Sequence, residues 1–167
     1  MQLIDPKFRK NEGRYVFQSF LATLALVVVL AVLDAISDAA IVGALGASSF
    51  IAFTMPYKHV SEARYLVGGY AVGVISGVAS YYASVLVGLS STAVLGASSS
   101  VVFGALAVGL AIFIMVVSNL EHPPAAGVAL GLVLNQCDPL AIIVIIVGIV
   151  ALATVKTMMK PLLIDLL

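Results

Sequence analysis

Long apolar runs without a charged residue dominate the chain, and only short polar stretches separate them. The uncharged runs are Tyr15–Leu33, Ala39–Tyr57, Tyr65–Leu120, Pro123–Cys137 and Pro139–Val155. The third run is long enough for two membrane spans of about 20 residues each and a turn between them. Hydrophobicity is continuous within each run rather than alternating, which predicts helices and not the strands of a membrane barrel.

These runs predict six hydrophobic segments, so the expected fold class is an all-α polytopic membrane helical bundle. We expect the helices near residues 15–34, 39–55, 64–88, 100–119, 122–136 and 139–158. An N-terminal segment (1–14) precedes the transmembrane domain (15–160), and a short C-terminal tail (161–167) follows it. No small-residue cleavage site follows the first run before Asp34, so we interpret that run as a retained span.

Composition narrows the classes of function. Hydrophobic residues make up 62% of the 167 residues and charged residues only 10%, well below the roughly one quarter typical of soluble domains. The formal net charge is +0, which gives no electrostatic reason to expect a nucleic-acid partner. Cys137 is the single cysteine, and neither a metal-binding motif nor a nucleophile motif is present. We therefore expect no enzyme activity, no metal and no cofactor.

The Lys and Arg residues predict the orientation in the membrane. If all six segments cross, every basic residue falls on one side, which the positive-inside rule makes cytoplasmic. These residues are Lys7, Arg9, Lys10, Arg14, Lys58, Arg64, Lys156 and Lys160. If the fifth segment did not cross, the last two would move to the opposite side. The pattern therefore predicts a multi-pass protein of the cell membrane with both termini in the cytoplasm.

The second and fifth segments are short and interrupted by glycine or proline. The second contains Gly43 and Gly46 and stops before Pro56, and the fifth opens on Pro123 and Pro124. A helix of about 15 residues rises roughly 22 Å, short of a hydrocarbon core of about 30 Å. Such segments at matching positions of two inverted halves are typical of a transporter site near the membrane midplane. The alternative is that small residues only let the helices pack closely.

Two kinds of internal repeat fit the sequence. Six crossings make the first and last three segments two triplets of opposite topology, which suggests a 3+3 inverted repeat. The pentapeptide 45–49 also recurs at 95–99, on the same side of the membrane, as a parallel repeat would require. A chain this rich in Gly, Ala and Ser can repeat by chance as well. We favour the inverted repeat and leave the parallel one open.

The stretch 121–124, Glu-His-Pro-Pro, carries the strongest chemical signal. Proline is favourable at the first helical position because the N–H that it lacks would be unpaired there. We expect the N–H groups of Ala125 and Ala126 to be free and to attract an anion to the helix end. His122 adds an imidazole that titrates near physiological pH, and Asn119 adds a neutral amide one turn earlier. The alternative is a solvated turn capped by its own polar residues.

Arg64 is the expected cationic partner of the anion, because its planar guanidinium suits a flat oxyanion. Arg64 could instead anchor its helix at the membrane surface. Glu121 could pair with Arg64 or with Lys58, either closing a gate or only satisfying a charge.

A doubled GxxxG pattern runs along the third segment, at Gly69, Gly73 and Gly77. This pattern predicts a face of close helix contact, either within the bundle or between protomers. A single site per chain and these glycine faces lead us to expect a homo-oligomer.

The chain resembles the HPP family of integral membrane proteins, which is named for the tripeptide at 122–124. The stretch 121–127 carries that motif, and 43–49 is similar to the family's Gly-Ala-Ser segment. Residues 62–64 and 68–70 resemble the family's Gln-Pro-Arg and Gly-Gly-His elements, with Tyr70 in the place of His. Some family members are similar to plastid and cyanobacterial nitrite transporters, so the resemblance implies a small flat monoanion as substrate.

We therefore expect a small-anion transporter or channel, with nitrite as the substrate that the resemblance suggests. The site should form where the second and fifth segments approach each other inside the lipid bilayer. The expected substrate-binding residues are Gly46, Ser48, Ser49, Arg64, Asn119, Glu121, His122, Pro123, Pro124 and Ala125. One rival is a non-transporting scaffold or sensor that acts through a partner protein. Another is an intramembrane enzyme with His122 and Glu121 as acid and base.

Overall fold

The computed structural model describes residues 8–33, 39–86 and 99–167, and every structural statement below refers to these residues. They form six α-helices, joined by two short 3-10 turns, η1 (His59–Ser61) and η2 (Lys160–Leu162), with no strand in these ranges. The α-helices are α1 (Phe8–Leu33), α2 (Ala39–Thr54), α3 (Ala63–Leu86), α4 (Ser99–Ser118), α5 (Pro123–Leu134) and α6 (Pro139–Met159). The predicted all-α bundle is confirmed. Five helices begin and end close to the predicted residues, whereas α1 begins earlier because it continues past a kink at Asn11.

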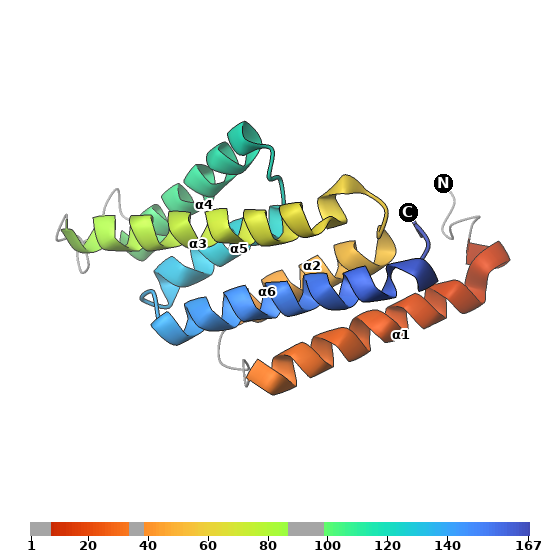
Figure 1. Cartoon of the computed structure of the whole chain (residues 1–167). Helices are drawn as coiled ribbons and strands as arrows, with labels where there is room; N and C mark the ends of the chain where they lie inside the picture. Colours follow the sequence, from red (N-terminus) through yellow and green to blue (C-terminus); the bar gives the residue numbers. More distant parts are fainter. Residues whose placement is uncertain (1–7, 34–38, 87–98) are drawn as a thin grey trace.

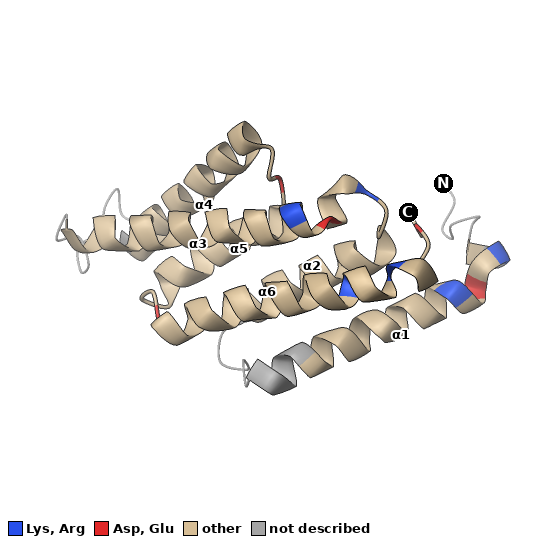
Figure 2. Cartoon of the chain, in the orientation of Figure 1, with Lys and Arg blue, Asp and Glu red and all other residues tan. Residues whose placement is uncertain are grey.

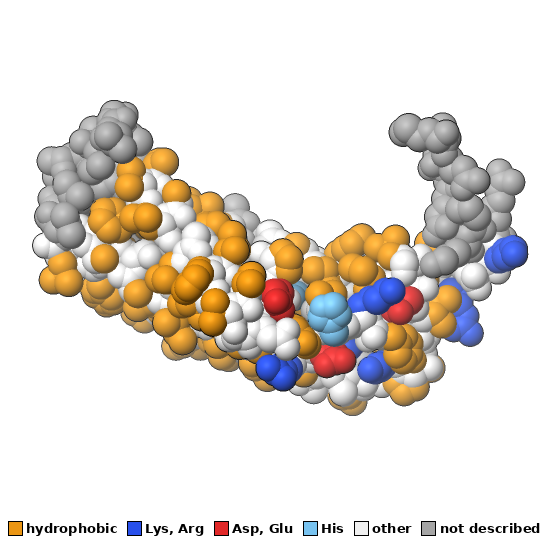
Figure 3. All heavy atoms as spheres, turned by 90° about the horizontal axis from the view of Figure 1, so that it is seen from above, with side chains coloured by type: hydrophobic (Ala, Val, Ile, Leu, Met, Phe, Trp, Pro, Cys, Tyr) orange, Lys and Arg blue, Asp and Glu red, His pale blue; other side chains and the backbone are white. Residues whose placement is uncertain are grey.

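The helices have the lengths and surfaces of a membrane bundle. Stretches at 63–86, 100–118 and 139–162, within or around α3, α4 and α6, are long and apolar enough to cross a membrane. Large apolar side chains point outward from the bundle, among them Phe20, Ile75, Phe113 and Val117. Figure 3 shows hydrophobic side chains covering much of one face, with the charged side chains gathered over its centre and right. An outward apolar surface of this extent suits lipid rather than water.

The predicted short segments remain short in the structure. Helix α2 has 16 residues and α5 has 12, which correspond to about 24 and 18 Å at a rise of about 1.5 Å per residue. Neither crosses a hydrocarbon core of roughly 30 Å alone. The two lie against each other, because Gly131 of α5 approaches Ala40 of α2 and His122 reaches Ser48. The predicted approach of the two short segments is therefore confirmed.

Charged residues mark one end of the bundle. Successive helices run in alternate directions, so the start of α1 and the C-terminal residues lie at the same end (Figure 1). The Lys and Arg of the described helices lie toward that end (Figure 2), whereas Asp138 caps the start of α6 at the opposite one. The one-sided distribution expected for six crossings is present, and the assignment of that side to the cytoplasm stays a prediction.

Glycine lets α3 lie directly against the start of α5. A Cβ at Gly69 would lie 2.5 Å from the Cβ of His122, and one at Gly77 would lie 2.9 Å from the Ala129 carbonyl oxygen. A Cβ at Gly73 would overlap the Ala125 carbonyl oxygen. The doubled GxxxG face therefore packs within the bundle, against α5, and not between protomers.

The C-terminal residues fold back over the charged end and are fixed there by Gln18. This glutamine is 1% exposed, and its amide nitrogen donates to the carbonyls of Phe53 (2.6 Å) and Ile164 (2.9 Å). Its amide oxygen accepts from the Ile164 N–H at 3.0 Å. Leu163 and Leu166 are buried. One side chain of α1 thus holds the end of α2 and the C-terminal residues together.

The repeat question stays open. The antiparallel contact of α2 with α5 fits two inverted triplets. The parallel alternative depends on the second pentapeptide, of which residues 95–98 lie outside the described part of the chain. The connections at 34–38 and 87–98 also lie outside the described part of the chain.

Replacing Gly73 with alanine should destabilise the bundle by about 1–3 kcal/mol, because the new methyl group meets backbone that cannot move aside alone. Thermal unfolding in detergent, followed by circular dichroism, measures the change. Gly109→Ala is the matched control, because a Cβ there meets nothing within 4 Å. Equal melting temperatures for the two variants would show that the close contact of α3 with α5 is wrong.

Replacing Gln18 with leucine should release the C-terminal residues, because two carbonyls and one N–H lose their partner at roughly 1–3 kcal/mol for a buried group. Hydrogen–deuterium exchange should rise in residues 163–167 and stay unchanged in α4. Thr23→Val on the same helix is the control, because Thr23 bonds only to its own helix at Ser19. Equal exchange in both variants would contradict this role of Gln18.

Candidate functional site

Three polar side chains meet inside the bundle, one from α2, one from α3 and one from the α4–α5 connection. Ser48 Oγ lies 2.9 Å from the Tyr70 hydroxyl and 2.8 Å from His122 Nε2. The Tyr70 and His122 rings lie 5.7 Å apart at 41°. All three residues are 0% exposed. We call Ser48, Tyr70 and His122 the polar cluster.

The polar cluster lies below the charged end of the bundle. Ser48 lies six residues before the end of α2, and Gly69, which lies against His122, lies six residues after the start of α3. At a rise of about 1.5 Å per residue, both positions are roughly 9 Å from the end of α2 at Thr54 and the start of α3 at Ala63. The connection between α4 and α5 therefore dips into the protein, as its path in Figure 1 shows. The alternative of a solvated turn is excluded for His122.

Local backbone geometry brings the connection back into the bundle. Asn119 adopts a left-handed conformation (φ 53°), and the Leu120 N–H donates to the Met115 carbonyl at 2.9 Å. These features are those of a Schellman motif, which ends α4 and reverses the chain. His122 is then the extended N-cap of α5 (φ −140°, ψ 92°), and Pro123 occupies the first helical position. Asn119, which ends α4, and Pro123, which begins α5, thus determine where His122 lies.

The expected anion site at free N–H groups of α5 is wrong in one part. The Ala125 N–H donates to the His122 carbonyl at 2.9 Å, so it is not free. Pro123 and Pro124 have no N–H, which leaves the first turn with no donor before Ala126. Ala125 itself is buried against Gly73. Any ligand here depends on side chains rather than on a row of helix N–H groups.

The hydrogen bonds of the polar cluster leave one ring nitrogen unused. If Ser48 donates to His122 Nε2, then Tyr70 can donate to Ser48 and the ring proton lies on Nδ1. Nδ1 is buried and has no hydrogen-bond partner, although the Val60 carbonyl lies near the ring. An unpaired buried polar atom costs about 1–3 kcal/mol. In this tautomer Nδ1 is a vacant donor that a ligand could satisfy, and it is a vacant acceptor in the tautomer in which Nε2 donates to Ser48.

The other expected substrate-binding residues do not join the polar cluster. Ser49 is buried, but its hydroxyl donates to the Ala22 carbonyl of α1 at 3.3 Å. Gly46 also faces α1, at Leu26. Arg64 is exposed with its guanidinium 5.9 Å from the Tyr65 ring centre.

Asn119 and Pro123 are exposed, and Pro124 is half-buried in the first turn of α5. These three residues shape the connection that carries His122. No ion pair joins Glu121 to Arg64 or to Lys58 among the described residues, so the structure does not contain that alternative pairing. Whether any of the ten expected residues binds a substrate stays a prediction.

A groove opens beside the polar cluster, between α4 and the start of α5. It has a volume of about 340 Å³, and its walls are Ile112, Met115, Val116, Glu121, His122, Pro123 and Ala126. Glu121, which is half-buried, is the one charged side chain among these wall residues. The groove surface is almost entirely apolar, and it presents neither a cation nor an exposed carboxylate next to the buried His122.

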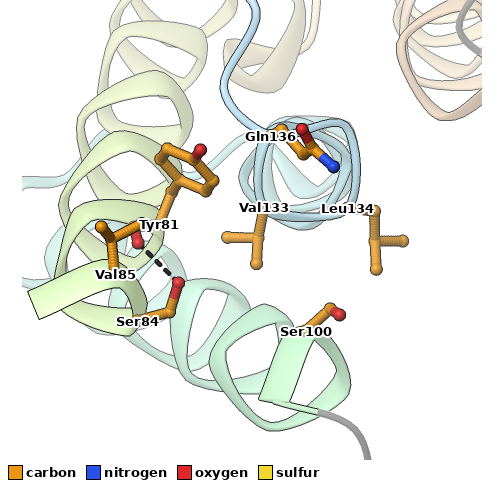
Figure 4. A pocket seen from close by; sticks show the side chains of 7 residues that line it. All are labelled: Tyr81, Ser84, Val85, Ser100, Val133, Leu134 and Gln136. Carbon is orange, nitrogen blue, oxygen red and sulfur yellow. Dashed lines mark hydrogen bonds between the residues drawn. The ribbon is translucent and has the colours of Figure 1, made fainter. Parts of the chain in front are cut away.

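A second cavity lies at the opposite end of the same helices. Its volume is about 270 Å³, and its walls come from α3, α4 and the end of α5 (Figure 4). Tyr81, Ser84, Ser100 and Gln136 supply polar groups, and none of the wall residues is charged. The Ser84 hydroxyl donates to the Tyr81 carbonyl at 2.6 Å. The cavity is thus neutral and polar.

Tyr70 and Lys156 are among the buried polar residues that the sequence did not suggest for the site. Tyr70 belongs to the polar cluster. The sequence feature that could have indicated this is that Tyr70 stands where the family pattern has histidine, so a polar group is kept at that position. Lys156 is 3% exposed near the end of α6, close to the charges of Glu62, Lys160 and Asp165. From the sequence it resembles an ordinary cation at the end of a span, and only packing shows that it is buried.

Comparison with known proteins gives one match. The model of the family described as HPP, transmembrane region, matches residues 9–163, which include the polar cluster and most of the described chain. No curated protein and no solved structure matches the chain.

Ser48→Ala and Tyr70→Phe should each lower the free energy of unfolding by roughly 0.5–1.5 kcal/mol, because each removes a buried hydrogen bond. Their combined effect should be smaller than the sum, because the two changes remove the same contact. Unfolding by SDS titration, followed by circular dichroism, measures the three values. Ser49→Ala combined with Tyr70→Phe is the control and should be additive, because Ser49 faces α1. Additivity in the test pair would mean that the cluster is not coupled.

Proposed function

The chain belongs to the HPP family of integral membrane proteins, and we propose that it moves a small inorganic anion across the membrane. The observation that carries the proposal is the polar cluster, which is fully buried where two short helices meet. A polar group in a membrane interior is expensive unless it is satisfied, and such groups are usually functional. His122 Nδ1 is unsatisfied, so the cluster has the unused capacity that a ligand needs.

The position of the cluster supports transport rather than anchoring. Short or discontinuous helices that meet inside a bundle are the usual setting of a transporter site. Here α2 and α5 are short, and His122 lies inside the bundle at the start of α5. A cavity lies beside the cluster and another at the opposite end of α3 and α5. The two cavities thus lie near the two ends of α5, and α4 contributes walls to both.

Nitrite is the substrate to test first. The hydroxyls of Ser48 and Tyr70 and the imidazole of His122 are neutral hydrogen-bonding groups that suit a small flat oxyanion. The family resemblance favours the same substrate. We further propose that both termini are cytoplasmic, that the protein has no catalytic step, and that it assembles as a homo-oligomer. The exposed apolar side chains of α4 offer a surface for such assembly or for lipid.

Nitrite uptake into liposomes that contain the purified protein should exceed uptake into protein-free vesicles. His122→Ala should reduce the difference by at least about tenfold, which corresponds to the loss of roughly 1.4 kcal/mol of binding. Ser48→Ala should reduce it several-fold. Ser49→Ala is the matched control and should transport at the normal rate, because its side chain faces α1.

Nitrate, formate and chloride are measured in parallel, and each variant is first checked for a monodisperse, helical state. Uptake no faster than in protein-free vesicles for every anion would remove the proposal. A stable hetero-complex on purification would then favour the scaffold or sensor. Normal flux in His122→Ala would show that His122 does not bind the transported anion, while transport itself would still stand.

A further inference from the structure

We propose that the anion passes the polar cluster together with one proton, so that no net charge crosses, and that the substrates are therefore anions of weak acids. This inference rests on the proposed transport function and adds the charge state of the transported species. It follows from three features: the polar cluster has no cation, the groove beside it is apolar, and the buried polar groups of α3 beyond it are neutral hydroxyls.

No positive charge is in place to balance a bare anion at the polar cluster. Arg64 is exposed and lies over the Tyr65 ring, and the first turn of α5 presents no free N–H before Ala126. Lys156 is buried, but the charges that act on it are those of Lys160, Glu62 and Asp165. An ion that leaves water without a counter-charge loses far more solvation than two hydroxyls and an imidazole return.

The groove beside the start of α5 disfavours a bare anion as well. Its surface is almost entirely apolar, because Glu121 and His122 expose hardly any polar atom to it. An ion loses its hydration on such a surface, whereas a neutral acid meets apolar walls at little cost.

The titratable groups around His122 are few. Tyr70 faces it from α3, and Glu121 precedes it in the connection. The described residues of α2, α4 and α5 contain no titratable side chain, and α2 contributes Ser48. The turn η1, whose Val60 carbonyl lies near the His122 ring, carries His59 and follows Lys58, and both of these side chains are exposed. His122 is therefore the group best placed to take up a proton from one side and to hold it next to the anion.

The path beyond the polar cluster requires the proton to travel on the anion. Between Tyr70 and the far cavity, the buried polar groups of α3 are the hydroxyls of Ser76, Ser80 and Ser84. Ser76 Oγ has no hydrogen-bond partner, and the far cavity has no charged wall residue. His122 cannot leave its place, so a proton that neutralises the substrate along these hydroxyls must be bound to the substrate. Nitrite and formate can carry it, because their conjugate acids are weak. Nitrate and chloride cannot, because theirs are strong.

The test uses the full-length protein in liposomes with a potassium gradient and valinomycin to set the membrane potential. A potential of 100 mV shifts the equilibrium of a bare monovalent anion by about 50-fold. We expect nitrite accumulation to be unchanged within twofold by that potential, and to follow an imposed pH gradient. Lowering the outside pH by one unit should raise the initial rate by up to about tenfold, because the protonated fraction rises by that factor. A pH dye inside the vesicles should report one proton per nitrite.

Protein-free vesicles correct for nitrous acid that crosses lipid unaided, and formate, nitrate and chloride define the selectivity. Voltage-independent uptake of nitrite and formate with no uptake of nitrate or chloride supports the proposal. Nitrite uptake that follows the potential, or that is matched by chloride, overturns it while leaving anion transport standing. No uptake of any anion overturns both.

Discussion

The close approach of α3 to the start of α5 is the contact on which the other features of the bundle depend. Gly69, Gly73 and Gly77 have no side chain, so the α3 backbone lies against His122 and the carbonyl oxygens of α5. Lipid provides no hydrophobic force between helices, and close backbone packing is one of the few forces that replaces it. This packing draws the α4–α5 connection below the helix ends, which in turn brings His122 beside Ser48 of α2.

The same contact explains how irregular backbone can exist at this depth. Unpaired backbone groups are tolerated within a membrane only where protein or water covers them. The connection meets that condition in part because the N–H groups of Asn119 and Leu120 bond to the end of α4 and the His122 carbonyl accepts from Ala125. His122 itself is buried against α2 and α3. The Pro123–Pro124 pair removes two further N–H groups that would need partners. A short α5 is thus a consequence of starting inside the protein, and the polar cluster occupies the space at its start.

The sequence predicts the helices well because continuous apolar length and flanking prolines are local signals. It predicts the site less well because burial is not local. Ser48 and Ser49 are neighbours with the same chemistry, yet about 100° of helix rotation sends one to His122 and the other to α1. Arg64 is positioned by sequence at a helix start, but only the fold shows that it lies outward. The sequence predicts a free Ala125 N–H, whereas in the structure this N–H donates to the His122 carbonyl. That bond depends on backbone geometry, which the residue types do not specify.

Most charged residues of the described chain lie at one end of the bundle, whereas the polar cluster inside it is neutral. The Lys and Arg of the described helices gather at this end, together with most of the acidic residues (Figure 2). The polar cluster lies roughly 9 Å further in, by helix rise, and contains only neutral groups, so it can select a ligand by hydrogen-bond geometry and shape but cannot hold it by charge. A site of that kind binds tightly only what arrives already neutral or becomes neutral on arrival. The imidazole of His122, with one ring nitrogen unpaired, is the group in the cluster that can supply or accept the proton that this requires.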